Sequence, residues 1–185
     1  MRILYTASEA LPYAASGGLA DVAGSLPAAL CKAGHDCRVV LPLYKSVKPE
    51  LRKDLRFLMN FTVDVGWRKQ YCGVFEGHAN NVTYYLLDNE YYYARDGLYG
   101  FYDDCERFVF LSRAVMELIR HIDWKPQIIN CNDWQTALVP VYYQTYYKYQ
   151  HGYEDIKTVF TIQNIQYQGK YGMDVLNEVM GIPMY

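Results

Sequence analysis

The start of the chain contains the feature that most restricts its fold: an apolar run, a glycine turn, a helical pattern and a second apolar run. Residues 3–7 form the first apolar run, and residues 37–43 form the second, which is rich in valine. Between them, apolar residues recur at helical spacing from Leu19 to Leu30, and Gly34 stands where a glycine ends many helices. Buried parallel strands are apolar along their whole length, so this order predicts a right-handed βαβ unit.

The turn before this helix carries a glycine pair, Gly17 and Gly18, inside the segment SGGLADV. Residues without a side chain let backbone N–H groups approach a phosphate or a sugar closely, and the helix adds its positive dipole end there. The pair therefore outlines a cradle for a phosphate or a nucleotide sugar, although an ordinary tight turn would use the same residues. It is not a GxGxxG fingerprint, which argues against a nicotinamide dinucleotide.

The rest of the pattern predicts one α/β domain over residues 1–185, a parallel sheet with helices on both faces. Turn residues between the strands at 57–87 indicate a small β-hairpin elaboration of this sheet. Asp103 and Glu106 match a capping box ahead of a long helix. The expected elements are strands at 57–65, 69–75 and 82–87, a helix ending near 122, a strand at 127–130, a helix from about 134 to 149 kinked at Pro140, a strand at 157–162 and a short helix at 173–180.

Composition excludes several classes of protein. The net charge of −2 gives no basic face for nucleic acid or for an anionic membrane surface. No apolar run approaches the roughly 18 residues of a membrane span, and no signal peptide opens the chain, so we expect a cytoplasmic protein. Five scattered cysteines and four dispersed histidines predict neither a disulfide framework nor a metal site.

Twenty tyrosines are the unusual part of the composition. They cluster at residues 84–102 and again at 142–153. A tyrosine joins an apolar ring to a polar hydroxyl, which suits a carbohydrate-binding surface as well as half-buried packing. Packing in the core and at its rim is the favoured interpretation of these clusters.

Three polar or glycine-rich turns follow predicted strands, at residues 8–18, 130–135 and 163–169. The carboxyl ends of parallel strands share one edge of a sheet, where ligands bind in open α/β folds, so we expect these turns to converge. Each turn taken alone is weak evidence for a ligand-binding site. Asp133 could equally cap the helix that follows it, and Gln163 and Asn164 could simply satisfy loop backbone groups.

Four segments carry a more specific signal: SEALPYAASGGLADVAGSLPAAL, RDGLYGFYDDCERF, CNDWQTALVP and KTVFTIQNIQYQGKYG. Together, in this order and spacing, they resemble the bacterial glycogen and starch synthases, glucosyltransferases that extend an α-1,4-glucan from ADP-glucose. The resemblance covers the chain nearly end to end. It implies the Rossmann-like N-terminal, acceptor-side half of a GT-B fold, whose partner, the second, C-terminal GT-B domain, is not expected within residues 1–185.

The resemblance also implies roles for individual residues. Asp133 and Gln163 are implied to act catalytically beside the transferring glucose, and Tyr99 is implied to contact the glucan acceptor. A retaining transfer with no metal and no cofactor is implied. The residues implied to bind the donor ADP-glucose are Glu9, Ala15, Gly17, Gly18, Asp21 and Asn164.

Two of these positions depart from the family pattern. Ala15 stands where the family has a lysine that contacts the sugar nucleotide, and a charge-assisted contact of that kind contributes about 1.5–3 kcal/mol. Gln163 stands where the family has a histidine, and glutamine cannot become a cation or shuttle a proton. We therefore expect weak or absent catalysis by this chain alone. The alternative is a non-catalytic glucan-binding or regulatory domain; a generic nucleotide-binding Rossmann protein explains none of the matched segments.

Overall fold

The computed structural model describes residues 1–183, which form a seven-stranded sheet of order β3-β4-β5-β2-β1-β6-β7. β5, β2, β1, β6 and β7 pair in parallel, whereas β3 and β4 extend the sheet as antiparallel strands. The strands are β1 (Arg2–Thr6), β2 (Asp36–Pro42), β3 (Arg56–Val65), β4 (Arg68–Ala79), β5 (Val82–Asp88), β6 (Ile128–Asn132) and β7 (Lys157–Thr161). The predicted parallel sheet with a hairpin elaboration is confirmed.

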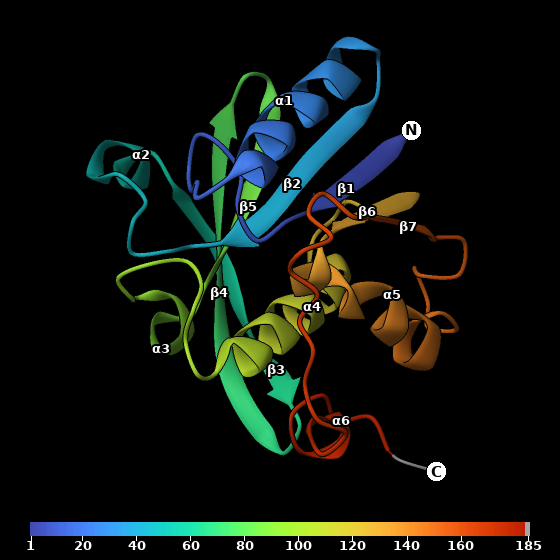
Figure 1. Ribbon diagram of the computed structural model, residues 1–185. Helices are drawn as coiled ribbons and strands as arrows, with labels where there is room; N and C mark the ends of the chain where they lie inside the picture. The colour runs from blue at the N-terminus through green and yellow to red at the C-terminus, as the bar shows by residue number, and fades with distance from the viewer. Residues whose placement is uncertain (184–185) are drawn as a thin grey trace.

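Helices cover both faces of this sheet. The connection from β1 to β2 crosses the sheet in one direction and the connection from β5 to β6 crosses it in the other, so right-handed crossovers put their helices on opposite faces. Figure 1 shows this arrangement, with α1 on one side and with α4 and α5 together on the other. The α-helices are α1 (Gly18–Lys32), α2 (Pro49–Lys53), α3 (Glu90–Tyr93), α4 (Asp104–His121), α5 (Leu138–Tyr142) and α6 (Val175–Glu178).

The end of α1 follows its sequence signal. Gly34 has φ +86°, and its N–H donates to the Cys31 carbonyl at 3.0 Å. The N–H of His35 donates to the Leu30 carbonyl at 3.1 Å, which completes a Schellman motif. The glycine stop predicted at residue 34 is confirmed.

The long helix α4 is confirmed, but the capping box at its start is wrong. Asp103 makes no capping hydrogen bond and instead forms a two-bond ion pair with Arg95, at 2.5 and 2.6 Å. Glu106 accepts from the Tyr92 hydroxyl and pairs with Arg68 at 3.3 Å. Both carboxylates have cationic or hydroxyl partners on other segments, which replace the local backbone donors.

The helical segment predicted over residues 134–149 is present over most of that length, but it is not one α-helix. A 3₁₀ turn at Trp134–Thr136, α5 and a π-helical turn at Tyr143–Tyr147 follow one another instead. Pro140 is the third residue of α5, where a missing N–H removes no hydrogen bond within the helix. The proline therefore stands in the first turn of a short helix and does not kink a long one.

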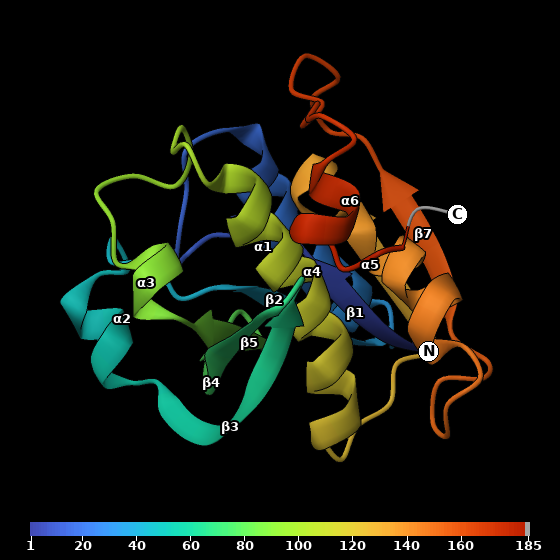
Figure 2. The same ribbon diagram turned by 90° about the horizontal axis from the view of Figure 1, so that it is seen from below.

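Two short helices were not predicted, and each has a local reason. α2 begins at Pro49, whose fixed φ suits a first helical residue. α3 is capped by Asn89, whose side chain accepts the Tyr92 N–H at 3.1 Å. In Figure 2, both helices lie on the side of the molecule that carries the β3–β4 hairpin.

Most of the clustered tyrosines are packing residues. Tyr84, Tyr92, Tyr93 and Tyr142 are fully buried, whereas the Tyr102 side chain is 91% exposed. The hydroxyl of the buried Tyr93 donates to the carbonyl of Arg107 at 3.0 Å. Tyrosine thus fills the interior with large rings while each hydroxyl finds a polar partner, as the packing interpretation requires.

Candidate functional site

The loops after β1 and β6 both leave the sheet at its carboxyl edge, from two neighbouring strands. After β1 the chain turns to α1 on one face, and after β6 it turns to α5 on the other. Neighbouring strands whose connections leave in opposite directions form the point where open α/β sheets bind ligands. The structure therefore places residues 7–17 and residue 133 at the position expected for a site.

Asp133 ties the end of β6 to the loop that follows β7. Its side-chain Oδ1 accepts the N–H of Gln163 at 2.7 Å and the N–H of Asn164 at 3.1 Å, and its own N–H donates to the Thr161 carbonyl at 3.0 Å. The helix-cap interpretation of Asp133 is wrong, because its side chain makes no capping bond. Its backbone has φ +57° and ψ 179°, a conformation that costs a non-glycine residue about 1–3 kcal/mol and is typical of functional sites.

Glu9 contacts the turn at residues 15–18, called the glycine loop below. It is almost fully buried, and its carboxylate accepts the N–H of Ser16. Burial raises the pKa of Glu9; the bond from Ser16 lowers it, and the nearby charge of Asp133 raises it further. The glycine loop is thus hydrogen-bonded to a buried carboxylate, and the charge of Asp133 raises the pKa of that carboxylate.

Nothing in the described residues requires glycine at positions 17 and 18. Gly17 has an extended backbone at φ −161°, which any residue adopts, and a Cβ there would lie 3.8 Å from Glu9 Oε1. A Cβ on Gly18, the first residue of α1, would meet no heavy atom within 4 Å. Both glycines are exposed. Two glycines without a structural need keep open space in front of the helix N-terminus, which is what a ligand cradle requires.

Tyr99, in the loop between α3 and α4, contacts the loop that follows β1. Its hydroxyl lies 2.7 Å from Ser8 Oγ, and the Ser8 carbonyl accepts the Tyr44 hydroxyl at 2.8 Å. Burial raises the pKa of Tyr99, and the nearby carboxylates of Glu9 and Asp133 raise it too. Tyr99 is therefore a neutral phenol beside two carboxylates.

Asn132 is a site residue that the sequence analysis missed. It is fully buried at the end of β6, and its Oδ1 accepts the Tyr5 hydroxyl at 3.0 Å and Gln163 Nε2 at 3.2 Å. Its Nδ2 donates to the Thr6 carbonyl at 3.0 Å and to Asn130 Oδ1 at 2.8 Å. The sequence offered one signal for Asn132, a polar residue at the end of an apolar strand. Asn132 fixes the Gln163 side chain against the sheet.

The loop at residues 163–171 crosses the face of Trp134. Gly169 has φ +56°, and a Cβ there would lie 2.3 Å from the indole, so this position requires glycine. The Trp134 ring also packs edge-on against Phe108, with centroids 5.1 Å apart, and against Tyr171 at 5.8 Å. A cavity of about 120 Å³ lies beside these rings. The loop is seated by aromatic packing at one end and by Asp133 at the other.

The structure does not bring every expected residue into contact. Glu9, Tyr99, Asp133 and Gln163 are linked by the bonds and charges described above. Ala15 is exposed at the rim of the glycine loop, and Asp21 is exposed on the first turns of α1. Within residues 1–183 the Asp21 side chain makes no hydrogen bond or ion pair with the other site residues.

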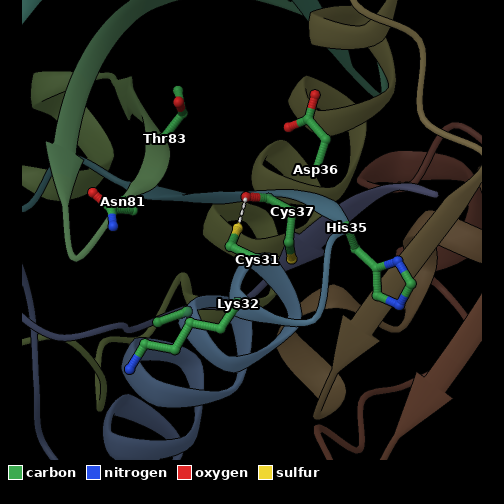
Figure 3. A pocket seen from close by; sticks show the side chains of 8 residues that line it. Cys31, Lys32, His35, Asp36, Cys37, Asn81 and Thr83 are labelled. Carbon is green, nitrogen blue, oxygen red and sulfur yellow. Dashed lines mark hydrogen bonds between the residues drawn. The ribbon is translucent and has the colours of Figure 1, made fainter.

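A larger hollow, of about 370 Å³, lies at the opposite edge of the sheet, where β2 and β5 begin. Figure 3 shows its polar side chains pointing in different directions, with Lys32 and His35 turned away from each other. Cys31 Sγ donates to the Cys37 carbonyl at 3.4 Å, and burial raises the pKa of Cys37 to about 12. A protonated thiol and diverging side chains form no converging set of groups in this hollow.

Residues 1–183 contain neither a cluster of metal-ligating side chains nor a helix able to cross a membrane. Their histidine, cysteine and acidic side chains form no group of three placed to hold a metal ion. None of the helices there combines the length and the apolar character needed to cross a bilayer.

Comparisons with known proteins show which family this chain resembles. A family model described as the starch synthase catalytic domain matches residues 2–185. A glycogen synthase from Clostridium botulinum (strain Alaska E43 / Type E3) is 52% identical over 182 residues, covering 98% of this chain and 38% of that protein. A glycogen synthase from Geobacillus stearothermophilus is 46% identical with the same coverage.

Solved structures give the same answer for the fold. The catalytic domain of starch synthase IV from Arabidopsis thaliana, bound to ADP and acarbose, matches with a TM-score of 0.88 and 30% identity. The match covers 96% of this chain and 36% of that one. The chain therefore spans less than two-fifths of the length of these relatives.

Proposed function

Because the chain belongs to the starch synthase catalytic domain family, we propose that it forms part of an enzyme that transfers glucose from ADP-glucose to an α-1,4-glucan. The observation that carries this proposal is the junction at Asp133, which accepts two N–H groups of the loop after β7 and whose charge acts on Glu9 and Tyr99. The starch synthase IV structure holds ADP and acarbose, which supports a nucleotide and a sugar chain as ligands here.

On the donor side, the exposed residues Gly17 and Gly18 at the start of α1 would face the diphosphate or the glucose of ADP-glucose. Oriented backbone donors at a helix start bind anionic groups well. Asn164 would border the glucose, since its backbone is fixed by Asp133. Asp21 belongs to this donor set as a proposal from the family pattern.

On the acceptor side, Tyr99 would contact the glucan. Asp133 and Gln163 would lie beside the donor glucose that is transferred. The 4-hydroxyl at the glucan end would attack the anomeric carbon from the face that the diphosphate leaves, with retention of configuration. Hydrogen bonds aimed at the leaving diphosphate would stabilise the developing charge. We propose that neither a metal nor a cofactor takes part.

The two departures from the family pattern weaken the donor side. Ala15 offers no cation where a phosphate contact would contribute about 1.5–3 kcal/mol. Gln163 can hydrogen-bond but stays neutral, and loss of one preorganised donor of this kind costs on the order of a hundredfold in rate. We propose that residues 1–185 alone have weak or no transfer activity.

The relatives extend well beyond the region that this chain matches, and this extra length is the basis of the second part of the proposal. We propose that residues 1–185 act as a single domain and that a C-terminal GT-B domain completes the nucleotide site. A cytoplasmic location is proposed with it, on the composition of the chain. Nucleic acid and membranes are not proposed as partners.

A second candidate function is a glucan-binding or regulatory domain without catalysis. Ala15 at the rim of the glycine loop favours it, because the missing cation affects the donor and leaves the acceptor side with Tyr99 intact. Under this alternative the acceptor surface keeps its function while the donor cradle does not.

One comparison of ligands separates the two candidates. Calorimetric titration of the purified chain with ADP-glucose and with maltoheptaose measures both sides of the site. Detectable ADP-glucose binding, with glucose transfer once a C-terminal domain is supplied, supports the enzyme and contradicts the regulatory candidate. Tight maltoheptaose binding with no ADP-glucose binding and no glucose transfer, even when a C-terminal domain is supplied, contradicts the enzyme for this chain.

A further inference from the structure

The two peptide groups that flank Tyr99 are both bonded to one ion pair on α4. Arg107 Nη1 donates to the Leu98 carbonyl at 3.0 Å, and the Gly100 N–H donates to Asp104 Oδ2 at 2.8 Å. The same Arg107 Nη1 lies 2.6 Å from Asp104 Oδ1. One ion pair therefore fixes the backbone immediately before and immediately after Tyr99.

Arg107 is fully buried, which is unusual for a guanidinium. Its Nε donates to the Tyr92 carbonyl at 2.8 Å, and its Cζ lies 4.8 Å from the centre of the Phe101 ring. Within residues 1–183 its Nη2 has no hydrogen-bond partner. The side chain is therefore fixed by backbone carbonyls, one carboxylate and aromatic packing.

Stability alone is a poor explanation for this arrangement. A buried ion pair is often no more stabilising than apolar residues of the same size, and a buried donor without a partner is a further cost. An arginine fork does, however, set the spacing of several acceptors at once. The loop needs such a constraint, because Gly97 at φ +125° and Gly100 at φ +91° leave its backbone with many alternatives.

We propose that Arg107 and Asp104 are positioning residues that hold Tyr99 in the orientation in which it contacts the glucan acceptor. The pair fixes the backbone on both sides of Tyr99, and the Tyr99 hydroxyl is then directed at Ser8, beside Glu9. This inference rests on the proposed function, because it assigns Tyr99 to the acceptor. Arg107 and Asp104 act through Tyr99 and are not placed against the glucan themselves.

The neighbouring pair of Arg95 and Asp103 offers a matched control. It lies at the start of the same helix and has equally short bonds, 2.5 and 2.6 Å. Arg95 also donates to the Tyr91 carbonyl and makes no bond to the peptide groups of residues 98–100. Breaking this pair perturbs the start of α4 without releasing Tyr99.

The test combines maltoheptaose titration with hydrogen exchange of the Gly100 amide, in the whole chain. Arg107→Lys is expected to weaken maltoheptaose binding about tenfold and to speed exchange at Gly100 about tenfold, while Arg95→Lys changes neither. Asp104→Asn is the milder second variant, since it keeps an acceptor oxygen for Gly100 but removes the charge that holds Arg107. Thermal melting shows that each variant is folded.

A double-mutant cycle separates positioning from general structure. In a Tyr99→Ala background, Arg107→Lys is expected to have no further effect on maltoheptaose binding. A tenfold loss that persists in that background overturns the inference, as does unchanged binding in both Arg107→Lys and Asp104→Asn. If the unaltered chain binds no maltoheptaose, the proposed function fails. Hydrogen exchange at Gly100 then still tests whether Arg107 fixes the backbone at Tyr99. Equal exchange rates in Arg107→Lys and Arg95→Lys contradict that role.

Discussion

Replacing Gly18 by alanine separates ligand binding from folding. Gly18 is the first residue of α1, and a Cβ there meets no heavy atom of the described chain within 4 Å. Alanine at a compatible helical position stabilises a protein by about 0.4–1 kcal/mol, which raises the Tm of a chain of this size by roughly 1–4 °C. The same methyl group occupies the space in front of the helix N-terminus, and forcing a ligand against it costs about 1–3 kcal/mol. We therefore expect Gly18→Ala to melt slightly higher and to bind ADP-glucose about tenfold more weakly.

Gly34→Ala is the control with the opposite pattern. Its φ of +86° is costly for alanine, by about 1–2 kcal/mol, and it lies at the far end of α1 from the cradle. We expect its Tm to fall by a few degrees and its ADP-glucose binding to stay unchanged. Calorimetric titration and thermal melting of both variants measure the two effects. Binding by Gly18→Ala equal to that of the unaltered chain, or a loss of stability like that of Gly34→Ala, refutes the reasoning.

Three further predictions concern single side chains. Ala15→Lys is expected to strengthen ADP-glucose binding about 10- to 100-fold, and added salt should reduce the gain; calorimetry at two salt concentrations checks this. Because the pKa of Glu9 is raised above its ordinary value of 4.5, the folded chain holds a proton there that the unfolded chain has lost. Glu9 therefore lowers the free energy of unfolding as the pH rises from acidic to neutral. Glu9→Gln should reduce this fall, which urea melts at several pH values measure. Asp133→Ala leaves the N–H groups of Gln163 and Asn164 without their acceptor, so amide exchange at both should accelerate while α4 is unaffected; unchanged exchange contradicts the junction.

Local signals were sufficient to predict much of the fold. Gly34 ends α1 because the left-handed conformation of a Schellman motif suits glycine, a property visible in the sequence. The valine-rich run at residues 37–43 predicted a central parallel strand, and β2 is buried between β1 and β5. Where the residue types of the segment itself decide its conformation, the prediction holds.

The errors arise where distant partners decide. Asp103 has the sequence of a helix cap, but Arg95 supplies a stronger, charged partner than the backbone N–H groups. Residues 134–149 have helical periodicity, yet they divide into 3₁₀, α and π turns. Neither outcome is encoded in spacing alone.

The candidate site shows the same difference between features that are visible locally in the sequence and features that depend on distant partners. Gly17 and Gly18 could be singled out because a glycine pair at a strand-to-helix turn is a local feature. Asp133 could be singled out as polar, but its bonds to the N–H groups of Gln163 and Asn164 depend on β6 and β7 pairing in parallel. Asn132 was missed because only the folded sheet shows which groups surround a buried amide.

One titration decides whether the loops after β1, β6 and β7 form the proposed donor site. Amide spectra of the ¹⁵N-labelled chain, recorded while ADP-glucose is added to millimolar concentration, report where the ligand binds. We expect shifts at Gly17, Gly18 and the 163–164 amides, with none in the hollow around Cys31 and Thr83. Shifts confined to that hollow, or no shifts at all, would contradict the proposed donor site.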